Sequence, residues 1–247
     1  MRLTFIGSGD AFGSGGRFNT CLLVEAGRTT MAVDFGATSL VALKQRGISP
    51  NVIDTVVLTH LHGDHFGGLP FFLLDAQFAS SRKAPLTIAG PPGTRARLEA
   101  ALEVFYPGAV GNDWRFPLKV IDLPLRTPWT FGEAKVESYE VDHASGAPST
   151  GVRVTAGGRV LAYSGDTTWT DALVDIARDA DLFVVECYRP SGRTANHLDL
   201  ETLIANRDRL TARAIMLTHM NEAMLAVRHK ATEAGFLLAE DGLTREV

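Results

Sequence analysis

The 247-residue sequence has little cysteine, no long hydrophobic run and no marked excess of one charge. Its two cysteines, Cys21 and Cys187, each lie in a short apolar, strand-like run. A free thiol there behaves as a small hydrophobic side chain, so we expect no disulfide. No stretch reaches the roughly 18 apolar residues of a membrane-spanning helix, and the amino-terminal apolar run is too short for a signal peptide. We therefore expect a cytoplasmic protein with no membrane partner.

The charge balance also limits the partners. Lys and Arg number 24 against 28 Asp and Glu, a formal net charge of −4. This argues against a generally basic surface for long nucleic acid, although a local basic patch stays open.

A hydrophobic content of 45% is ample for a buried core. We expect a single domain, 1–247, whose two halves meet near 107–128, a poorly periodic stretch rich in proline. Its aromatic residues and those just beyond it either line a pocket or fill the core: Trp114, Phe116, Trp129 and Phe131.

The chemistry gathers in one short segment. His60, His62, Asp64 and His65 fall within six residues, directly after the apolar, β-branched run 54–59, which reads as a buried strand. Imidazole and carboxylate groups suit Zn²⁺, Mn²⁺ or Fe²⁺, and Gly63 would let the chain fold back so that the ligands converge. The segment predicts a dinuclear metal site, with Zn²⁺ favoured and Mn²⁺ or Fe²⁺ as alternatives.

Three further residues share one property with this segment. His143, Asp166 and His219 each follow an apolar, strand-like run. Loops at the strand ends along one edge of a sheet can converge, and sites are commonly built there. Singly, a histidine after a strand is more often a structural hydrogen-bonding group. Together with the segment they supply seven donors for two ions, which would lower the pKa of a shared water from 15.7 towards about 7 and make a hydroxide nucleophile.

Asp34 ends the strand-like run 29–35 and has two interpretations. It caps the helix expected over 38–46, or its carboxylate orients a metal-bound histidine. The residues alone leave both open.

The His-x-His-x-Asp-His pattern at 60–65 resembles the signature of the metallo-β-lactamase-fold hydrolases. The resemblance implies an α/β fold, a four-layered αββα sandwich, consistent with the alternating strands and helices. The stretches 5–9, 19–21 and 88–94, together with a final hairpin expected over 236–247, resemble the ribonuclease Z and phosphodiesterase branch. By resemblance, three residues hold the first ion, three the second and one bridges them: His60, His62 and His143, then Asp64, His65 and His219, with Asp166 between.

The same resemblance supplies the catalytic residues His197, Asp64 and Glu186. His197 lies ahead of a helix on a long loop, where that branch places a proton donor braced by a glutamate. The branch carries His-Glu-Ala-Thr around the brace, whereas this chain reads Val185-Glu186-Cys187-Tyr188, so only Glu186 is kept. His229 falls among polar neighbours, and we expect it to face solvent.

One departure concerns the substrate. The resemblance implies an arm that clasps tRNA between the third histidine ligand and the bridging aspartate, but only 22 residues separate His143 from Asp166. We therefore predict a phosphodiesterase for a small or cyclic phosphodiester. The alternatives are a lactonase, thioesterase or sulfatase on the same site, a ribonuclease Z-type endonuclease and, least favoured, a non-catalytic scaffold. A homodimer stays open.

Overall fold

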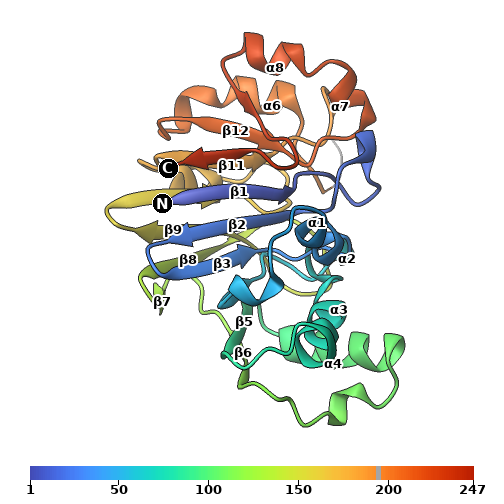
Figure 1. Cartoon of the computed structure of the whole chain (residues 1–247). Helices are drawn as coiled ribbons and strands as arrows, with labels where there is room; N and C mark the ends of the chain where they lie inside the picture. Colours follow the sequence, from blue (N-terminus) through green and yellow to red (C-terminus); the bar gives the residue numbers. More distant parts are fainter. Residues whose placement is uncertain (193–195) are drawn as a thin grey trace.

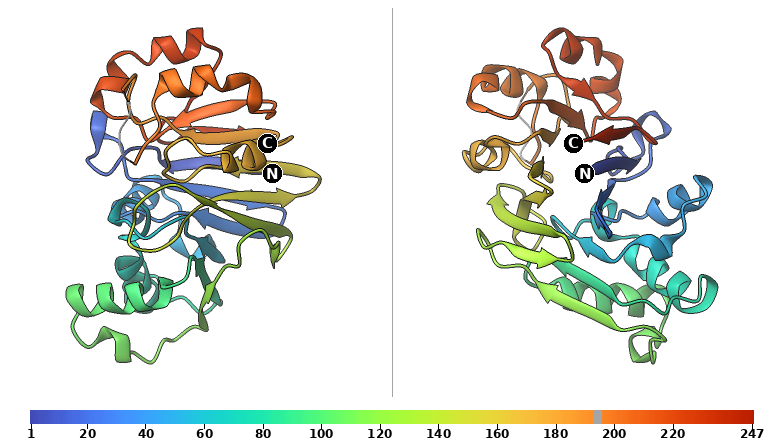
Figure 2. Two further views of the ribbon diagram at one scale, coloured as in Figure 1. Left: turned by 180° about the vertical axis from the view of Figure 1, so that it is seen from behind. Right: turned by 60° about the vertical axis from the view of Figure 1, so that its left-hand side comes forward.

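A computed structural model describes residues 1–192 and 196–247 of the chain. Two mixed β-sheets lie face to face, and helices cover the outer side of each (Figures 1 and 2). This arrangement is the four-layered αββα sandwich that the resemblance implies. That the chain forms one domain stays a prediction.

The first sheet contains seven strands within the described residues, in the order β14-β1-β2-β3-β4-β5-β6. Strands β1 to β3 are antiparallel neighbours, as the sequence predicts, and β3 to β6 run parallel. Their bounds are Arg2–Gly7 for β1, Cys21–Ala26 for β2, Thr29–Val33 for β3, Thr55–Val57 for β4, Leu86–Gly90 for β5, Leu118–Asp122 for β6 and Thr244–Glu246 for β14.

The second sheet, counted over the same residues, has the order β13-β12-β11-β10-β9-β8-β7. Strands β7 to β10 are antiparallel, and β10 to β13 run parallel. The bounds are Trp129–Phe131 for β7, Ala134–Val141 for β8, Ser149–Ala156 for β9, Arg159–Tyr163 for β10, Leu182–Glu186 for β11, Ile215–Thr218 for β12 and Leu237–Leu238 for β13.

The hairpin expected over 236–247 is wrong. β13 pairs with β12 in the second sheet, whereas β14 pairs with β1 in the first. Asp241 lies between them, and its carboxylate accepts hydrogen bonds from the backbone N–H groups of Ser8 and Phe18. The segment therefore crosses between the sheets, because each of its strands finds its partner in a different one.

The helices divide between the two outer faces. The first sheet is covered by α1 (Ser39–Gln45), α2 (Gly63–Phe66), α3 (Leu69–Leu74) and α4 (Thr94–Phe105), with a π-helical turn at Asp75–Ala79. The second is covered by α5 (Ala172–Ala177), α6 (Leu200–Ala205), α7 (Glu222–Ala226) and α8 (His229–Glu233). Short 3₁₀ turns lie at Ser14–Gly16, Pro50–Val52, Ala109–Gly111 and Arg207–Arg209.

One long helix over 221–234, which the sequence suggests, is replaced by α7 and α8. Val227 departs from helical geometry, with φ −119° and ψ 20°, and separates the two. His229 begins α8 and is exposed, as expected.

Strand alternation explains the layering. Leu22 and Val24 of β2 point into the core between the two sheets, and Leu23 points into the core under α1 to α4. A third core lies between the second sheet and α5 to α8 and includes Phe183 and Leu217. Burying each such side chain stabilises the folded state by about 1.5–3 kcal/mol. Both faces of each sheet are therefore packed, and the strand ends provide rigid attachment points for the loops.

The aromatic residues near 107–131 belong mainly to these cores. Phe116 and Phe131 are buried, and Trp114 packs beside the core under the helices, whereas Trp129 on β7 is 38% exposed. The core interpretation is therefore right for Phe116 and Phe131, whereas Trp114 also lines a surface pocket. Within the described ranges, no helix is long and apolar enough to cross a membrane.

Candidate metal centre

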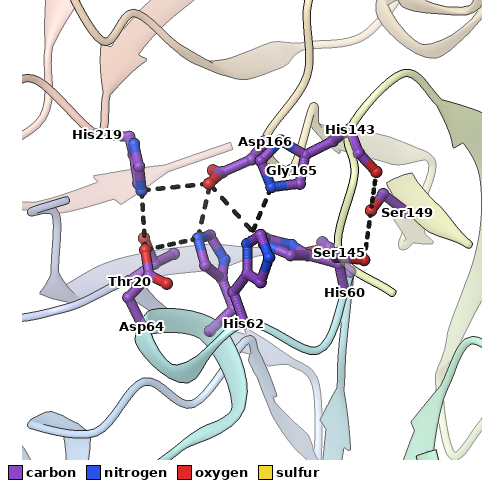
Figure 3. Close-up of polar contacts among 12 residues, drawn as sticks. Thr20, His60, His62, Asp64, His143, Ser145, Ser149, Gly165, Asp166 and His219 are labelled. Carbon is purple, nitrogen blue, oxygen red and sulfur yellow. Dashed lines mark hydrogen bonds and ion pairs between the residues drawn. The ribbon is translucent and has the colours of Figure 1, made fainter. Parts of the chain in front are cut away.

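The metal-capable side chains meet where loops leave strands of both sheets. The 60–65 segment follows β4 of the first sheet, and His143, Asp166 and His219 follow β8, β10 and β12 of the second. Figure 3 shows the six of these side chains that it labels pointing toward one another: His60, His62, Asp64, His143, Asp166 and His219. The structure thus brings together all seven residues that the sequence nominates.

His60, His62 and His143 form the first group. Each offers one ligand atom, and these atoms lie within 4.8 Å of one another. His143 Nε2 and His62 Nδ1 are 3.0 Å apart, while His143 Nδ1 donates to the backbone oxygen of Asn196 at 2.8 Å. That outward hydrogen bond turns the other ring nitrogen of His143 toward the centre.

Asp64, His65, Asp166 and His219 form the second group, and all four are buried. His219 Nε2 lies 3.1 Å from Asp64 Oδ2 and 3.4 Å from Asp166 Oδ2. His65 Nε2 lies 3.2 Å from Asp166 Oδ1. Asp166 Oδ2 is also 3.8 Å from His60 Nε2, so its carboxylate stands between the two groups (Figure 3).

Asp34 contacts a histidine of this centre on the side away from the other ligands. Its Oδ2 accepts a 2.7 Å hydrogen bond from His65 Nδ1, and its Oδ1 accepts one from the backbone N–H of Thr59 at 2.8 Å. Helix α1 starts after Thr38 without a side-chain cap. Asp34 therefore orients a histidine and does not cap α1. Its hydrogen bond fixes the His65 ring and directs Nε2 inward.

Two glycines allow the loops to approach. A Cβ on Gly36 would lie 2.1 Å from the backbone oxygen of Asp64. Gly165, just before Asp166, has φ +60°, and a Cβ there would lie 2.6 Å from the oxygen of Thr150. Gly63, expected to reverse the chain, instead starts α2 without a left-handed backbone. The close approach therefore depends on Gly36 and Gly165.

The ionisable groups are strongly coupled. Burial lowers the pKa of His65, but the carboxylates of Asp166, Asp64 and Asp34 outweigh it and hold that pKa well above the usual value. Burial also lowers the pKa of His219, but Asp166 and the hydrogen bond to Asp64 outweigh burial and raise that pKa to about 9. Burial and the nearby His65 lower the pKa of His60. The nearby carboxylates therefore favour the protonated imidazoles of His65 and His219 when no ion is bound.

Several buried polar atoms of the centre make no well-directed hydrogen bond within the described residues, although His65 Nε2 and Asp166 Oδ1 lie 3.2 Å apart: His60 Nε2, His65 Nε2, His219 Nδ1 and Asp166 Oδ1. Leaving such groups unsatisfied is unfavourable, and buried polar atoms without partners are rare. Imidazole nitrogens and carboxylate oxygens at this spacing are the ligands of Zn²⁺ and similar ions. The donor set fits divalent metal binding.

His197 and Glu186 lie beside the second group. His197 Nδ1 contacts both carboxylate oxygens of Glu186, at 3.1 and 3.2 Å, and lies 3.9 Å from Asp166 Oδ2. Glu186 is fully buried at the end of β11 and also accepts a 2.6 Å hydrogen bond from the backbone N–H of Thr167. Burial lowers the pKa of His197, but the hydrogen bond to Glu186 outweighs it and raises that pKa.

The chain resembles known proteins in both sequence and fold. A family profile described as "Anti-Pycsar protein Apyc1" matches residues 1–241. The chain belongs to this family. The anti-Pycsar protein Apyc1 of Paenibacillus sp. (strain J14) is 29% identical over 245 residues, covering 96% of each chain. Ribonuclease Z of Mycolicibacterium gilvum (strain PYR-GCK) is 30% identical over 194 residues, covering 74% of this chain and 68% of that protein.

The fold of this Apyc1 family member is also found among solved structures. The metallo-β-lactamase fold protein YhfI from Bacillus subtilis superposes with a TM-score of 0.79 at 20% identity over 99% of both chains. The predicted fold and family branch are therefore confirmed: the protein is a metallo-β-lactamase-fold, metal-dependent hydrolase related to ribonuclease Z.

The sequence did not predict two residues that support the site in this Apyc1 family member. The ring of Tyr188 stacks on His197, with centroids 4.7 Å apart. Ser149 donates a 2.9 Å hydrogen bond to the backbone oxygen of His143 (Figure 3). Tyr188 could have been suspected, because it follows Glu186 by two residues and an aromatic ring there lies at the same strand end. Ser149 carries no comparable signal.

Proposed function

We propose that the protein is a dinuclear phosphodiesterase for a small or cyclic phosphodiester. The observation that carries this proposal is the Glu186–His197 pair, whose 3.1 Å contact lies directly beside the His/Asp centre. A hydrolase that expels a good leaving group needs no proton donor, whereas an alkoxide leaving a phosphodiester does.

The metal ligands follow the two groups. His60, His62 and His143 would hold one ion, and Asp64, His65 and His219 the other, with Asp166 between them. Zn²⁺ is the favoured ion because nitrogen donors dominate, with Mn²⁺ or Fe²⁺ as alternatives. Bound ions would supply charge neutralisation for the phosphate and an activated water.

Side chains of the protein would then accept one proton and donate another during the reaction. A water oxygen forms a bond to phosphorus while the bond between phosphorus and the leaving oxygen breaks. Asp64 would accept the proton that the water loses, and His197, hydrogen-bonded to Glu186, would give a proton to the leaving oxygen. The products are a phosphomonoester and an alcohol, joined in one molecule when the substrate is cyclic.

The size of the substrate is argued from the segment between His143 and Asp166. Strands β9 and β10, joined at Gly157 and Gly158, occupy most of its 22 residues. This leaves little chain for an arm that clasps tRNA. The ribonuclease Z relatives make an RNA endonuclease the second candidate.

A panel assay tests the proposal. Metal-loaded protein is given bis(p-nitrophenyl) phosphate, a nucleoside cyclic phosphate, p-nitrophenyl phosphate, a lactone, a thioester, an aryl sulfate and a precursor tRNA. We expect turnover of the two phosphodiesters to exceed that of the others by at least about a hundredfold. Preference for the lactone, thioester or sulfate would overturn the phosphodiesterase, and preference for the tRNA would favour the endonuclease.

A further inference from the structure

A cavity of about 370 Å³ opens at the end of the sandwich opposite the candidate metal centre. Its lining includes the amino ends of the strands whose carboxyl ends lead to the site: Arg159 begins β10, Leu182 begins β11 and Ala214 precedes β12. Figure 1 shows the same separation, with both chain ends on one side and α2 on the other. Because the five residues of β10 alone span about 16 Å, this cavity is distinct from the metal centre.

The floor of this cavity, which we call the basal cavity, is apolar. Leu182 and Met216 are buried members of the core between the two sheets, and Ala214 and Leu237 are partly buried against that core. The lining comes from β12 and β13 of the second sheet and from β14 of the first. A hydrocarbon group in the cavity would therefore extend the inter-sheet core and lose its contact with water, which favours binding.

The rim of the basal cavity is charged. Guanidinium groups outnumber carboxylates by three to two among the side chains that line it: Arg159, Arg213 and Arg245 against Asp181 and Glu246. Positive charge above an apolar floor matches a ligand that has one negative group at the end of an apolar body. The volume also falls within the range of small-molecule sites.

Asp181 positions two of the guanidinium groups. Its Oδ1 accepts hydrogen bonds from Arg159 Nη1 at 2.9 Å and Arg213 Nη1 at 3.0 Å. Its Oδ2 accepts one from the backbone N–H of Val160 at 2.9 Å, and this bond, followed by the one from Arg159, lowers the pKa of the carboxyl. A guanidinium has five N–H donors, and each of these two gives one to Asp181. Both side chains are at least half exposed, so the remaining donors can reach an anion.

We propose that the basal cavity binds an amphipathic anion, with a carboxylate head on a short, unbranched hydrocarbon tail. The head would accept hydrogen bonds from Arg159 and Arg213, since guanidinium and carboxylate pair well in a planar geometry. The tail would lie against Leu182, Met216 and Leu237. Such a ligand would contact β14 of the first sheet and the strands of the second together, and would join the sheets at the end away from the metal centre. This site does not depend on the proposed function.

Calorimetric titration of the metal-loaded full chain with octanoate tests the head and the tail. We expect octanoate to bind with a Kd below about 1 mM and to raise Tm. Acetate and inorganic phosphate lack the tail, and octylammonium has the opposite charge, so each should bind at least about tenfold more weakly. No binding of octanoate would overturn the proposal, and equal binding of acetate or octylammonium would overturn the amphipathic anion as the ligand class.

Variants locate the binding. Arg159→Gln combined with Arg213→Gln should weaken octanoate binding at least about tenfold, because charge-assisted hydrogen bonds are lost. Arg95→Gln, which removes an exposed arginine of α4, is the matched control and should bind as wild type. Undiminished affinity in the double variant would place octanoate elsewhere and overturn the site.

Two further variants test the floor. Ala214→Phe should fill the cavity and weaken octanoate binding at least about tenfold while both guanidiniums stay in place. Leu237→Ala removes apolar contact without adding bulk, and should narrow the difference in affinity between octanoate and acetate if the larger side chain prevents folding. Octanoate binding that neither variant alters would refute the apolar floor and, with it, the proposal.

Discussion

Asp34 Oδ2 and His65 Nδ1 form a 2.7 Å hydrogen bond between two fully buried side chains. Asp34 adopts a left-handed backbone, with φ +62°, at the end of β3, so its carboxylate turns under the 60–65 loop. A carboxylate behind a ligating histidine fixes the ring and raises its basicity. The bond joins the residue that follows β3 of the first sheet to the metal centre.

Asp34→Ala should weaken metal binding by about 10- to 100-fold, because the His65 ring loses its orienting partner. Metal content after dialysis against a chelator series measures this. Asp122→Ala, at the exposed end of β6, is the matched control. Unaltered metal affinity in Asp34→Ala would show that the ring is held by other contacts.

His197→Ala should lower kcat for bis(p-nitrophenyl) phosphate by at least about tenfold, and by about 10²- to 10⁴-fold for a diester with an alkoxide leaving group. The poorer leaving group gains more from a proton donor. Bound metal should be unchanged, and His229→Ala on exposed α8 should behave as wild type. Equal turnover in His197→Ala and wild type would remove the proton-donor role.

The metal-free protein should lose stability as pH rises. The folded chain raises the pKa of His219 to about 9, above the roughly 6.5 of an unfolded chain. Its protonated form therefore stabilises the fold fully below about pH 6.5, and this contribution disappears as pH rises through about 9. Thermal unfolding of EDTA-treated protein between pH 6 and 10 should show Tm falling by several degrees. The decrease in Tm between pH 6 and 10 should be smaller in His219→Gln. An equally large decrease in that variant would show that another group causes the pH dependence.

Gly36→Ala should destabilise the protein by roughly 1–3 kcal/mol and reduce metal content, since its Cβ would collide with the Asp64 backbone 2.1 Å away. Urea unfolding and metal analysis provide the two readouts. Gly111→Ala meets nothing within 4 Å and is the control. Native-like stability in Gly36→Ala would mean that the loop can shift at little cost.

Neither cysteine should react with a thiol reagent at pH 8 while the protein is folded. Burial raises the pKa of Cys21 to about 12, which leaves about one thiolate in ten thousand, and burial also raises the pKa of Cys187. Both thiols should react in urea. Rapid labelling of either one in the native protein would contradict its burial.

The sequence alone predicts those features of the fold and the site that depend on local chemistry. The motif 60–65 and the strand-end residues His143, Asp166 and His219 were recognisable because ligand types at strand ends converge, and the resemblance then ordered the layers. The seven ligand assignments and the roles of His197, Asp64 and Glu186 stay predictions, although the geometry places all nine side chains around one centre.

Features that depend on long-range contacts could not be predicted. The pairing of β14 with β1 joins Thr244 to Thr4, and nothing in a local Asp-Gly turn signal distinguishes that from a hairpin. The role of Asp34 needed the position of His65, 31 residues away. A cavity lined by Trp169 and Thr202 likewise exists only because the loop after β10 meets α6.

The crossing of the last strands between the sheets has a consequence for the timing of folding. β1 is made well before β14, yet β14 is the partner of one of its two edges. During synthesis on the ribosome that edge stays open, and an unpaired edge invites association with other chains. Completion of the first sheet must therefore wait until β14 has been synthesised, and a chain truncated after β13 should be prone to aggregate.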